Sequence, residues 1–364
     1  MRQDSNGRFF EVDAVKFFAI IYMISVHSYE CFGAFDYYHT MPDTLYRNIL
    51  EFFGGPLAAP VFMFCMGIGM VFTRHNSSSD FIRRGFKLLI TGYLLNFFRQ
   101  TVPMLIAMAL DVETGFSLIG GLLNVDILPF AGMAFLTIGL MKKKELSTSV
   151  MLVIALLFQA AGIWATKLKI ASVAVATLLG LLLPTGEHVA FPLTLWLVYP
   201  VLGTLFGECL KKTSDRTSFY KKSTVAAAVF FTAYSVALIY GGYDIRLFYA
   251  LCENNYYFQA LLHILWIVPL IVLTIGGCYF LLGGIKDTFL GRFISYCSIN
   301  LNTIYIIQWL LIGYGLGVAI LLGFESTTSP LVISLIAISL MTSAVLISLI
   351  CRKIKDRKKK SLST

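Results

Sequence analysis

An acid, a lysine and a histidine interrupt a segment that otherwise has the composition of a membrane helix, "DAVKFFAIIYMISVH" at residues 13–27. Lys16 and His27 are eleven residues apart, which on an α-helix is about 20° from whole turns and about 16 Å of rise. Asp13 precedes Lys16 by three residues and can pair with it. One face of the helix therefore carries all three. An imidazole there can exchange protons near neutral pH, so His27 suits a general base or a covalent acceptor.

These three residues also allow a simpler interpretation. Asp13 and Lys16 could anchor the helix end at the membrane interface, with the lysine amine reaching towards water, while His27 is a buried hydrogen-bonding residue. An ionisable side chain in hydrocarbon is costly and usually marks a functional site. Because His27 shares its face with two charges, we expect a wet or protein-lined interior around it.

A second group of polar residues lies in "TRHNSSSDFIRRGFK" at residues 73–87. Arg74, Arg83, Arg84 and Lys87 come together there between two apolar stretches. They could simply keep this loop on the cytoplasmic side, as basic loops do. Alternatively, they form a dock for phosphate groups, since arginine matches phosphate in a bidentate way and a cluster can hold a nucleotide-bearing molecule.

The remaining candidate site residues are less specific. His39 and Asp43 lie in a loop with several aromatic residues, "FDYYHTMPD", an arrangement that suits sugar stacking over the mouth of a cavity. His39 could equally be a surface histidine. The seven cysteines are scattered with no close pair, so we interpret them as apolar filling and expect no metal site.

The whole composition indicates a polytopic membrane protein. Of 364 residues, 57% are hydrophobic and 13% are charged, which excludes an ordinary soluble domain. The net charge of +9 gathers in short runs beside apolar stretches, which indicates membrane topology and no nucleic-acid partner. The first apolar stretch lacks a convincing cleavage site and is expected to remain as the first span.

The apolar stretches predict an all-α bundle of about ten transmembrane helices. Their ranges are 14–33, 55–73, 85–105, 125–141, 148–166, 191–210, 223–242, 257–281, 297–322 and 330–350. Counting 170–184 as an eleventh span would move a basic loop outside, so we expect it to be a short re-entrant or interfacial segment. Both termini are then cytoplasmic. We expect one integral-membrane domain over 1–350 and a basic cytoplasmic tail over 351–364.

Several segments resemble the transmembrane acyltransferase superfamily, which includes the acyltransferase-3 family and the heparan-α-glucosaminide N-acetyltransferase-like family. The opening "VDAVKFFAIIYMISVH", then "PVFMFCMGIGMVFTR" and "DFIRRGFKLL", follow its order and spacing. In the acyltransferase-3 pattern an arginine precedes a histidine with ten residues between them, and Lys16 and His27 occupy those positions. "NVDILPFAGMAFL" and "FPLTLWLVYPVLGTLFG" are similar to the N-acetyltransferase-like branch. "ISYCSINLNTIYIIQW" is similar to the late helix of the acyltransferase-3 domain.

Two positions depart from the pattern of the superfamily. Lys16 replaces the arginine and loses its bidentate geometry. Gln308 stands where many members have another histidine. Both departures leave the donor chemistry intact and bear on the choice of acceptor and on activity itself.

The resemblance implies transfer of an acetyl or other short acyl group from cytoplasmic acyl-CoA to a hydroxyl or amine of a glycan or sugar of the cell envelope. Acetyl-CoA would be a donor substrate, with no cofactor bound permanently. The implied roles are catalysis by His27, Lys16 and Asp13, phosphate binding by Arg83, Arg84, Lys87 and Arg74, and acceptor binding by His39, Asp43, Glu30 and Gln308.

Two other functions compete with acyl transfer. A small-solute transporter would also be a bundle of this size, although internal repeats or paired broken helices would be expected in it. A catalytically inactive scaffold for envelope synthesis is the other alternative. In each case we expect a multi-pass protein of the plasma membrane, which could also associate with copies of itself.

Overall fold

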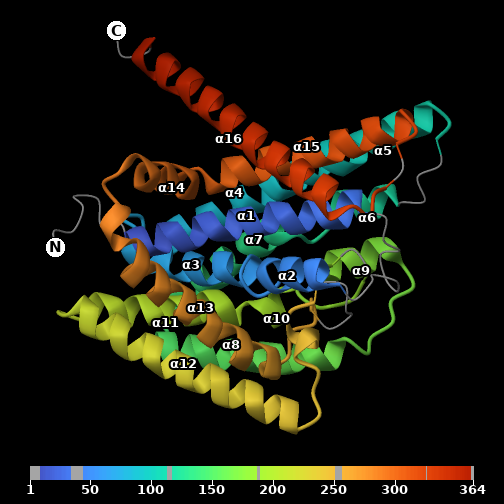
Figure 1. Cartoon of the computed structure of the whole chain (residues 1–364). Coiled ribbons are helices and arrows are strands. Elements are labelled where there is room, and N and C mark those ends of the chain that lie inside the picture. The colour runs from blue at the N-terminus through green and yellow to red at the C-terminus, as the bar shows by residue number, and fades with distance from the viewer. Residues whose placement is uncertain are drawn as a thin grey trace.

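The computed structural model describes residues 9–33, 44–112, 117–186, 189–250, 256–324 and 326–361. Within these ranges the chain is all-α, with two isolated bridges and no regular strand (Figure 1). The predicted fold class, an all-α membrane bundle, is confirmed. His39 and Asp43 lie outside the described residues.

Helix α1 (Phe10–Phe32) runs through the middle of the bundle. It contacts α2 (Leu45–Gly54), α3 (Ala59–Phe72), α13 (Leu261–Leu282) and three helices of the C-terminal third. Those three are α14 (Phe289–Ile299), α15 (Leu301–Leu321) and α16 (Pro330–Ser361). Since protein surrounds α1 on several sides, its polar face does not have to meet lipid.

Two helix pairs pack closely because glycines remove side chains from the contact. Helix α4 (Ser78–Asn96) packs on α7 (Ile127–Lys143), where a Cβ on Gly132 would lie 2.9 Å from the Gly85 carbonyl oxygen. Helix α3 packs in the same way on α11 (Val198–Lys212), where a Cβ on Gly67 would overlap the Pro200 carbonyl. Small residues of this kind let membrane helices approach.

The other segments complete the bundle and its connections. They are the π-helical turn η1 (Phe97–Thr101), α5 (Val102–Ala109), α6 (Leu118–Leu123), α8 (Thr148–Ala165), α9 (Val173–Leu179), α10 (Leu193–Trp196), α12 (Arg216–Tyr240) and the 3-10 turns Ile245–Phe248 and Gly283–Ile285.

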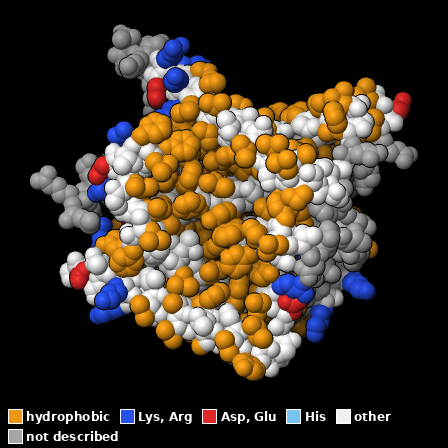
Figure 2. Space-filling model, in the orientation of Figure 1, with side chains coloured by type: hydrophobic (Ala, Val, Ile, Leu, Met, Phe, Trp, Pro, Cys, Tyr) orange, Lys and Arg blue, Asp and Glu red, His pale blue; other side chains and the backbone are white. Residues whose placement is uncertain are grey.

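Seven helical stretches of the described chain are long and apolar enough to cross a membrane. They are Leu45–Phe72, Thr148–Ala165, Leu193–Lys212, Arg216–Tyr240, Leu261–Ile285, Leu301–Leu321 and Pro330–Lys358. Helices α1, α4 and α7 occupy the other three expected spans, so the number ten stays a prediction. Segment 170–184 contains only the seven-residue α9, too short to cross a bilayer. In Figure 2 hydrophobic side chains cover most of the face shown, with charged ones near its margins.

Basic loops from distant parts of the sequence meet at one end of the bundle. The Arg216 guanidinium lies 4.5 Å from the ring centre of Phe9, at the start of α1. Phe9 packs against Phe72, with ring centroids 4.5 Å apart. The Lys142 ammonium donates to the Asn76 carbonyl at 2.7 Å. Which side of the membrane this end faces stays a prediction.

The basic C-terminal segment expected as a tail continues the last helix. Helix α16 runs from Pro330 to Ser361 without a break at residue 351. The Arg352 guanidinium lies 5.5 Å from the ring centre of Tyr296 on α14, so the tail begins against the bundle.

Candidate functional site

His27, in the C-terminal half of α1, lines a small pocket between helices. Three further polar side chains line it: Glu30, Asp126 and Tyr305. The apolar and aromatic part of the lining includes Met23, Val26, Phe62, Phe191, Tyr256 and Tyr257. Its volume of about 40 Å³ has room for a few water molecules at most. A sugar ring could therefore enter only if the walls move apart.

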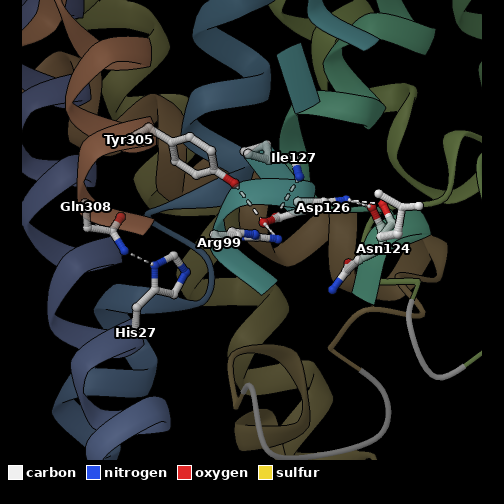
Figure 3. A network of polar contacts seen from close by, with 9 residues as sticks. His27, Arg99, Asn124, Asp126, Ile127, Tyr305 and Gln308 are labelled. Carbon is white, nitrogen blue, oxygen red and sulfur yellow. Dashed lines mark hydrogen bonds and ion pairs between the residues drawn. The ribbon is translucent and has the colours of Figure 1, made fainter. Parts of the chain in front are cut away.

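Helix α15 brings two side chains onto the imidazole of His27. The Gln308 side-chain nitrogen lies 3.0 Å from Nδ1 of His27, 281 residues away along the chain (Figure 3). The next residue, Trp309, packs on the imidazole with ring centroids 4.2 Å apart. Tyr305 precedes them by one helical turn on the same face. Helix α15 therefore contacts both the edge and the face of the His27 imidazole ring.

The Asp126 carboxylate is bonded on both oxygens. Oδ1 accepts the Ile127 amide at 2.7 Å, because Asp126 is the N-cap residue of α7. Oδ2 accepts the Tyr305 hydroxyl at 2.8 Å and pairs with Nη2 of Arg99 at 2.8 Å (Figure 3). A carboxylate that is 15% exposed and has a counter-charge and two hydrogen bonds is fixed in position.

Arg99 reaches Asp126 from the π-helical turn η1, which interrupts the helical run from α4 to α5. Such turns shift side chains relative to a regular helix and are frequent at functional sites. Arg99 is 4% exposed, and its guanidinium lies 4.2 Å from the ring centre of Trp309. Trp309 is thus in contact with both Arg99 and His27.

The backbone beside Asp126 is held from two directions. The Asn96 side chain, at the end of α4, donates to the carbonyls of Leu122 and Asn124 at 3.2 and 2.7 Å. From the other side, the amides of Ala190 and Phe191 donate to the Val125 carbonyl at 3.1 and 3.2 Å. These bonds fix the start of α7 next to the pocket.

A buried polar network also fixes the aromatic wall of the pocket. The Tyr256 hydroxyl donates to the Gly55 carbonyl at 3.0 Å, and the Trp196 indole donates to the Tyr257 carbonyl at 3.1 Å. Gln259 accepts the Tyr199 hydroxyl at 2.6 Å. Since these bonds satisfy buried groups, the wall is built into the core.

Asp13 and Lys16 form the predicted ion pair, with 3.6 Å between Lys16 Nζ and Asp13 Oδ1. The Ser298 hydroxyl donates to the same oxygen at 2.6 Å and joins α1 to α14. Lys16 lies about 16 Å along α1 from His27, and neither member of the pair is in the pocket lining. Of the predicted site residues, the pocket brings together His27 and Glu30, with Gln308 behind the imidazole.

The predicted basic cluster lies at the opposite end of α4 from Arg99. Arg74, Arg83, Arg84 and Lys87 are all exposed, and the Arg84 guanidinium packs 4.6 Å from the ring centre of Phe135. Fifteen residues separate Arg84 from Arg99, or about 22 Å of helix. The cluster is therefore accessible and well away from the pocket.

A hydrogen-bonded cap fixes the start of α4 beside the cluster. The Ser77 hydroxyl donates to the Asp80 carboxylate at 2.7 Å and accepts the Asp80 amide at 3.1 Å. The bond from Ser77 lowers the pKa of Asp80, which is partly exposed. An ionised carboxylate at a helix N-terminus is favourable.

Four residues of this site were missed by the sequence reasoning: Arg99, Asp126, Tyr305 and Trp309. Arg99 carried a usable signal, because it is a lone arginine in the apolar stretch 85–105 and such residues are functional candidates. Among the residues that the structure describes, no group of three or more His, Cys, Asp or Glu side chains could hold a metal ion.

Comparison with known families gives a match over most of the chain. The family model described as "Heparan-alpha-glucosaminide N-acetyltransferase, catalytic" matches residues 8–245. This range includes His27, Arg99 and Asp126, while the helix that carries Tyr305, Gln308 and Trp309 comes after it. No curated protein matches the chain significantly.

Proposed function

The chain belongs to the heparan-α-glucosaminide N-acetyltransferase catalytic family, and from this premise we propose that it moves an acetyl or other short acyl group from cytoplasmic acyl-CoA to a hydroxyl or amine of a cell-envelope glycan or sugar. The family implies a membrane acetyltransferase. The donor, the acceptor and the roles of individual residues are our proposal.

One observation carries the proposal: His27 lines a small pocket between helices together with Asp126. An imidazole that takes up a proton becomes a cation, and a fixed carboxylate nearby stabilises that cation. Arg99, Tyr305 and the Ile127 amide hold the carboxylate so that it does not need to reorganise during the reaction.

The chemistry can follow two routes at His27. In direct transfer, the imidazole removes the proton of the acceptor hydroxyl or amine, which attacks the thioester carbon; the carbon–sulfur bond breaks, and the proton passes to the leaving thiolate. In the covalent route, a nitrogen of His27 attacks the thioester carbon, the carbon–sulfur bond breaks and CoA leaves as the thiolate; the acceptor then attacks the acyl carbon, the carbon–nitrogen bond to His27 breaks, and the proton of the acceptor passes to the thiolate. Asp126 supports either route, because a positive imidazole forms in both.

The donor enters from the end of the bundle that carries the basic cluster. Arg83, Arg84, Lys87 and Arg74 bind the phosphates of CoA, since exposed arginines match phosphate in a bidentate way. The pantetheine arm then follows α1 past Lys16 and Asp13 towards His27. The span of about 16 Å between Lys16 and His27 is bridged by the extended arm.

The acceptor reaches the pocket from the other end. Glu30 lines the pocket beside His27, and its carboxylate would accept a hydrogen bond from a hydroxyl or amine of the sugar. Once the walls of the pocket have moved apart, Tyr256, Tyr257 and Phe191 provide aromatic surface for a sugar ring. His39 and Asp43 are proposed to contact the part of the glycan that stays outside.

The experiment that tests the proposal compares purified parent and His27→Ala in detergent or nanodiscs, with radiolabelled acetyl-CoA and a panel of sugars and glycans. His27→Ala should lose transfer while keeping its elution volume and melting temperature. His27→Gln should not restore it, because an amide cannot take up the proton. His263→Ala is the matched control, since His263 caps α13 through the Ala260 amide at 3.1 Å.

Two results would count against the proposal. Near-normal turnover by His27→Ala would remove His27 from the mechanism. Unchanged acylation of envelope glycans by mass spectrometry, in cells with and without the protein, would reject a glycan acceptor.

A further inference from the structure

His27 has one pocket-facing nitrogen and one nitrogen in contact with Gln308. Gln308 is fully buried, and its amide lies at Nδ1 of His27 at 3.0 Å. Figure 3 shows the second ring nitrogen, Nε2, on the side away from Gln308. His27 lines the pocket and Gln308 does not, so Nε2 is the nitrogen available to substrate.

Both routes of the proposed reaction need a lone pair on Nε2. A general base accepts the proton there, and a covalent acceptor bonds the acyl carbon there. Neutral imidazole has one proton, so a free lone pair on Nε2 requires that proton on Nδ1. After proton uptake both nitrogens carry hydrogen, and the partner of Nδ1 must again be an acceptor.

The amide of Gln308 can supply that acceptor by a half-turn about its last bond. In the orientation of Figure 3 its nitrogen faces Nδ1, while its oxygen Oε1 is buried without a hydrogen-bond partner in the described structure. The amide oxygen and nitrogen have nearly the same shape, so exchanging them needs no other movement. The exchange gives Oε1 a partner and moves the proton of His27 to Nδ1.

The imidazole itself is less free to turn than the amide. Trp309 covers its face with 4.2 Å between ring centroids, and Arg99 packs on Trp309. With the ring held, the group opposite Nδ1 decides where the proton sits. In metal sites the same arrangement fixes the tautomer of histidine ligands.

Resting on the proposed function, we infer that Gln308 is a positioning residue that accepts the Nδ1 hydrogen of His27 through Oε1 and so keeps the lone pair on Nε2. The proton taken from the acceptor goes to Nε2 and then to the thiolate of the donor, while the Nδ1 hydrogen stays bonded to Gln308. This residue lies after the range matched by the family model, 8–245, and adds a part of the site that the match does not cover.

Two substitutions separate an acceptor role from a donor role. Gln308→Glu keeps the acceptor and removes the donor, so it should keep transfer activity, with the acidic limb of the pH–rate profile moved to higher pH because a carboxylate stabilises the imidazolium more than an amide does. Gln308→Met keeps the length and loses the hydrogen bond. Its kcat should fall by about tenfold or more, with the KM for acyl-CoA unchanged. Equal pH profiles for the parent and Gln308→Glu, or an inactive Gln308→Glu that is folded by melting temperature, would overturn the inference.

A spectroscopic measurement tests the same inference without any substrate. Solid-state ¹⁵N spectra of histidine-labelled protein show which imidazole nitrogen carries the proton, and His27→Ala identifies the His27 signals among those of the five histidines. Neutral His27 of the parent should carry its proton on Nδ1. Gln308→Met should shift it towards Nε2, and Gln159→Met, a buried glutamine that bonds the Gln259 carbonyl, should not.

A proton on Nε2 in the neutral parent would overturn the inference even if the protein transfers acyl groups. A proton on Nδ1 in a protein without transferase activity would support this role of Gln308 and reject the proposed function. The two failures are therefore distinguishable.

Discussion

Asp126 and Arg99 form a buried pair in which each residue depends on the other. Their ion pair is 2.8 Å long, and Arg99 is 4% exposed. Removing one partner of such a pair leaves an uncompensated charge, whereas replacing both with neutral groups is often tolerated. This asymmetry allows the structural and catalytic roles of Asp126 to be measured separately.

We predict that Asp126→Asn loses both stability and turnover. The buried guanidinium of Arg99 would lack a counter-charge, at a cost of about 3 kcal/mol in the free energy of unfolding. The double variant Arg99→Gln with Asp126→Asn should recover most of the thermal stability while turnover stays low, since the pocket then lacks the Asp126 carboxylate that stabilises a positive His27. Melting temperatures and initial rates test this, with Tyr305→Phe as the mild control that removes one hydrogen bond, worth about 1 kcal/mol. Full recovery of turnover in the double variant would show that Asp126 is only structural.

At the residue scale, local spacing was readable from the sequence and long-range contacts were not. The Asp13–Lys16 pair follows from a separation of three residues on one helix. The contact between Gln308 and His27 spans 281 residues, and that between Tyr305 and Asp126 spans 179. Such contacts depend on how helices pack, which hydropathy and periodicity do not specify.

Helix α4 carries a different function at each end. Its first three turns carry Arg83, Arg84 and Lys87 of the exposed basic cluster, while Arg74 lies just before the helix. The π-helical turn that follows α4 aims Arg99 at Asp126. A single helix thus connects the proposed phosphate dock to the proposed chemistry over about 22 Å. The apolar composition predicted a span here, but one residue added to a helical turn leaves no mark in hydropathy, so the π-helical turn could not be predicted.

At this scale we predict that Arg83→Gln and Arg84→Gln weaken acyl-CoA binding. A lost charge-assisted contact is worth roughly 1.5–3 kcal/mol, or about ten- to a hundredfold. The effect should raise the KM for the donor with little change in kcat, because phosphates far from the thioester are bound equally in ground and transition states. Titration of acyl-CoA at low and high salt tests this, since salt should narrow the gap between parent and variants. Lys221→Gln, at an exposed lysine on α12, is the control. Equal donor affinity in the parent and all three variants would show that Arg83 and Arg84 serve only to set the membrane topology.

At the scale of the whole molecule, the bundle has two chemically different ends. One end brings together four segments: the start of α1, the loop after α3, the end of α7 and the start of α12. They meet through the contacts of Phe9, Lys142 and Arg216. His27 and Asp126 belong to the opposite half, near the C-terminal part of α1 and the N-terminus of α7. Charge patterns predicted that the basic loops share one side, because positive residues are retained in the cytoplasm.

We predict that the basic end faces the cytoplasm and the end nearer His27 faces outwards. In intact cells an impermeant thiol reagent should label Tyr243→Cys, in the exposed loop after α12, and should leave Ser214→Cys, in the loop before α12, unlabelled. Opening the cells should make Ser214→Cys reactive. The parent supplies the background for its own seven cysteines, of which the exposed Cys209 and Cys351 are expected on the cytoplasmic side.

The two labelled sites flank a single helix, so they must lie on opposite sides if α12 crosses the membrane. Labelling of Ser214→Cys alone in intact cells would invert the predicted orientation. A donor made in the cytoplasm would then meet the wrong end of the bundle, and the path from the basic cluster to His27 would have to be abandoned.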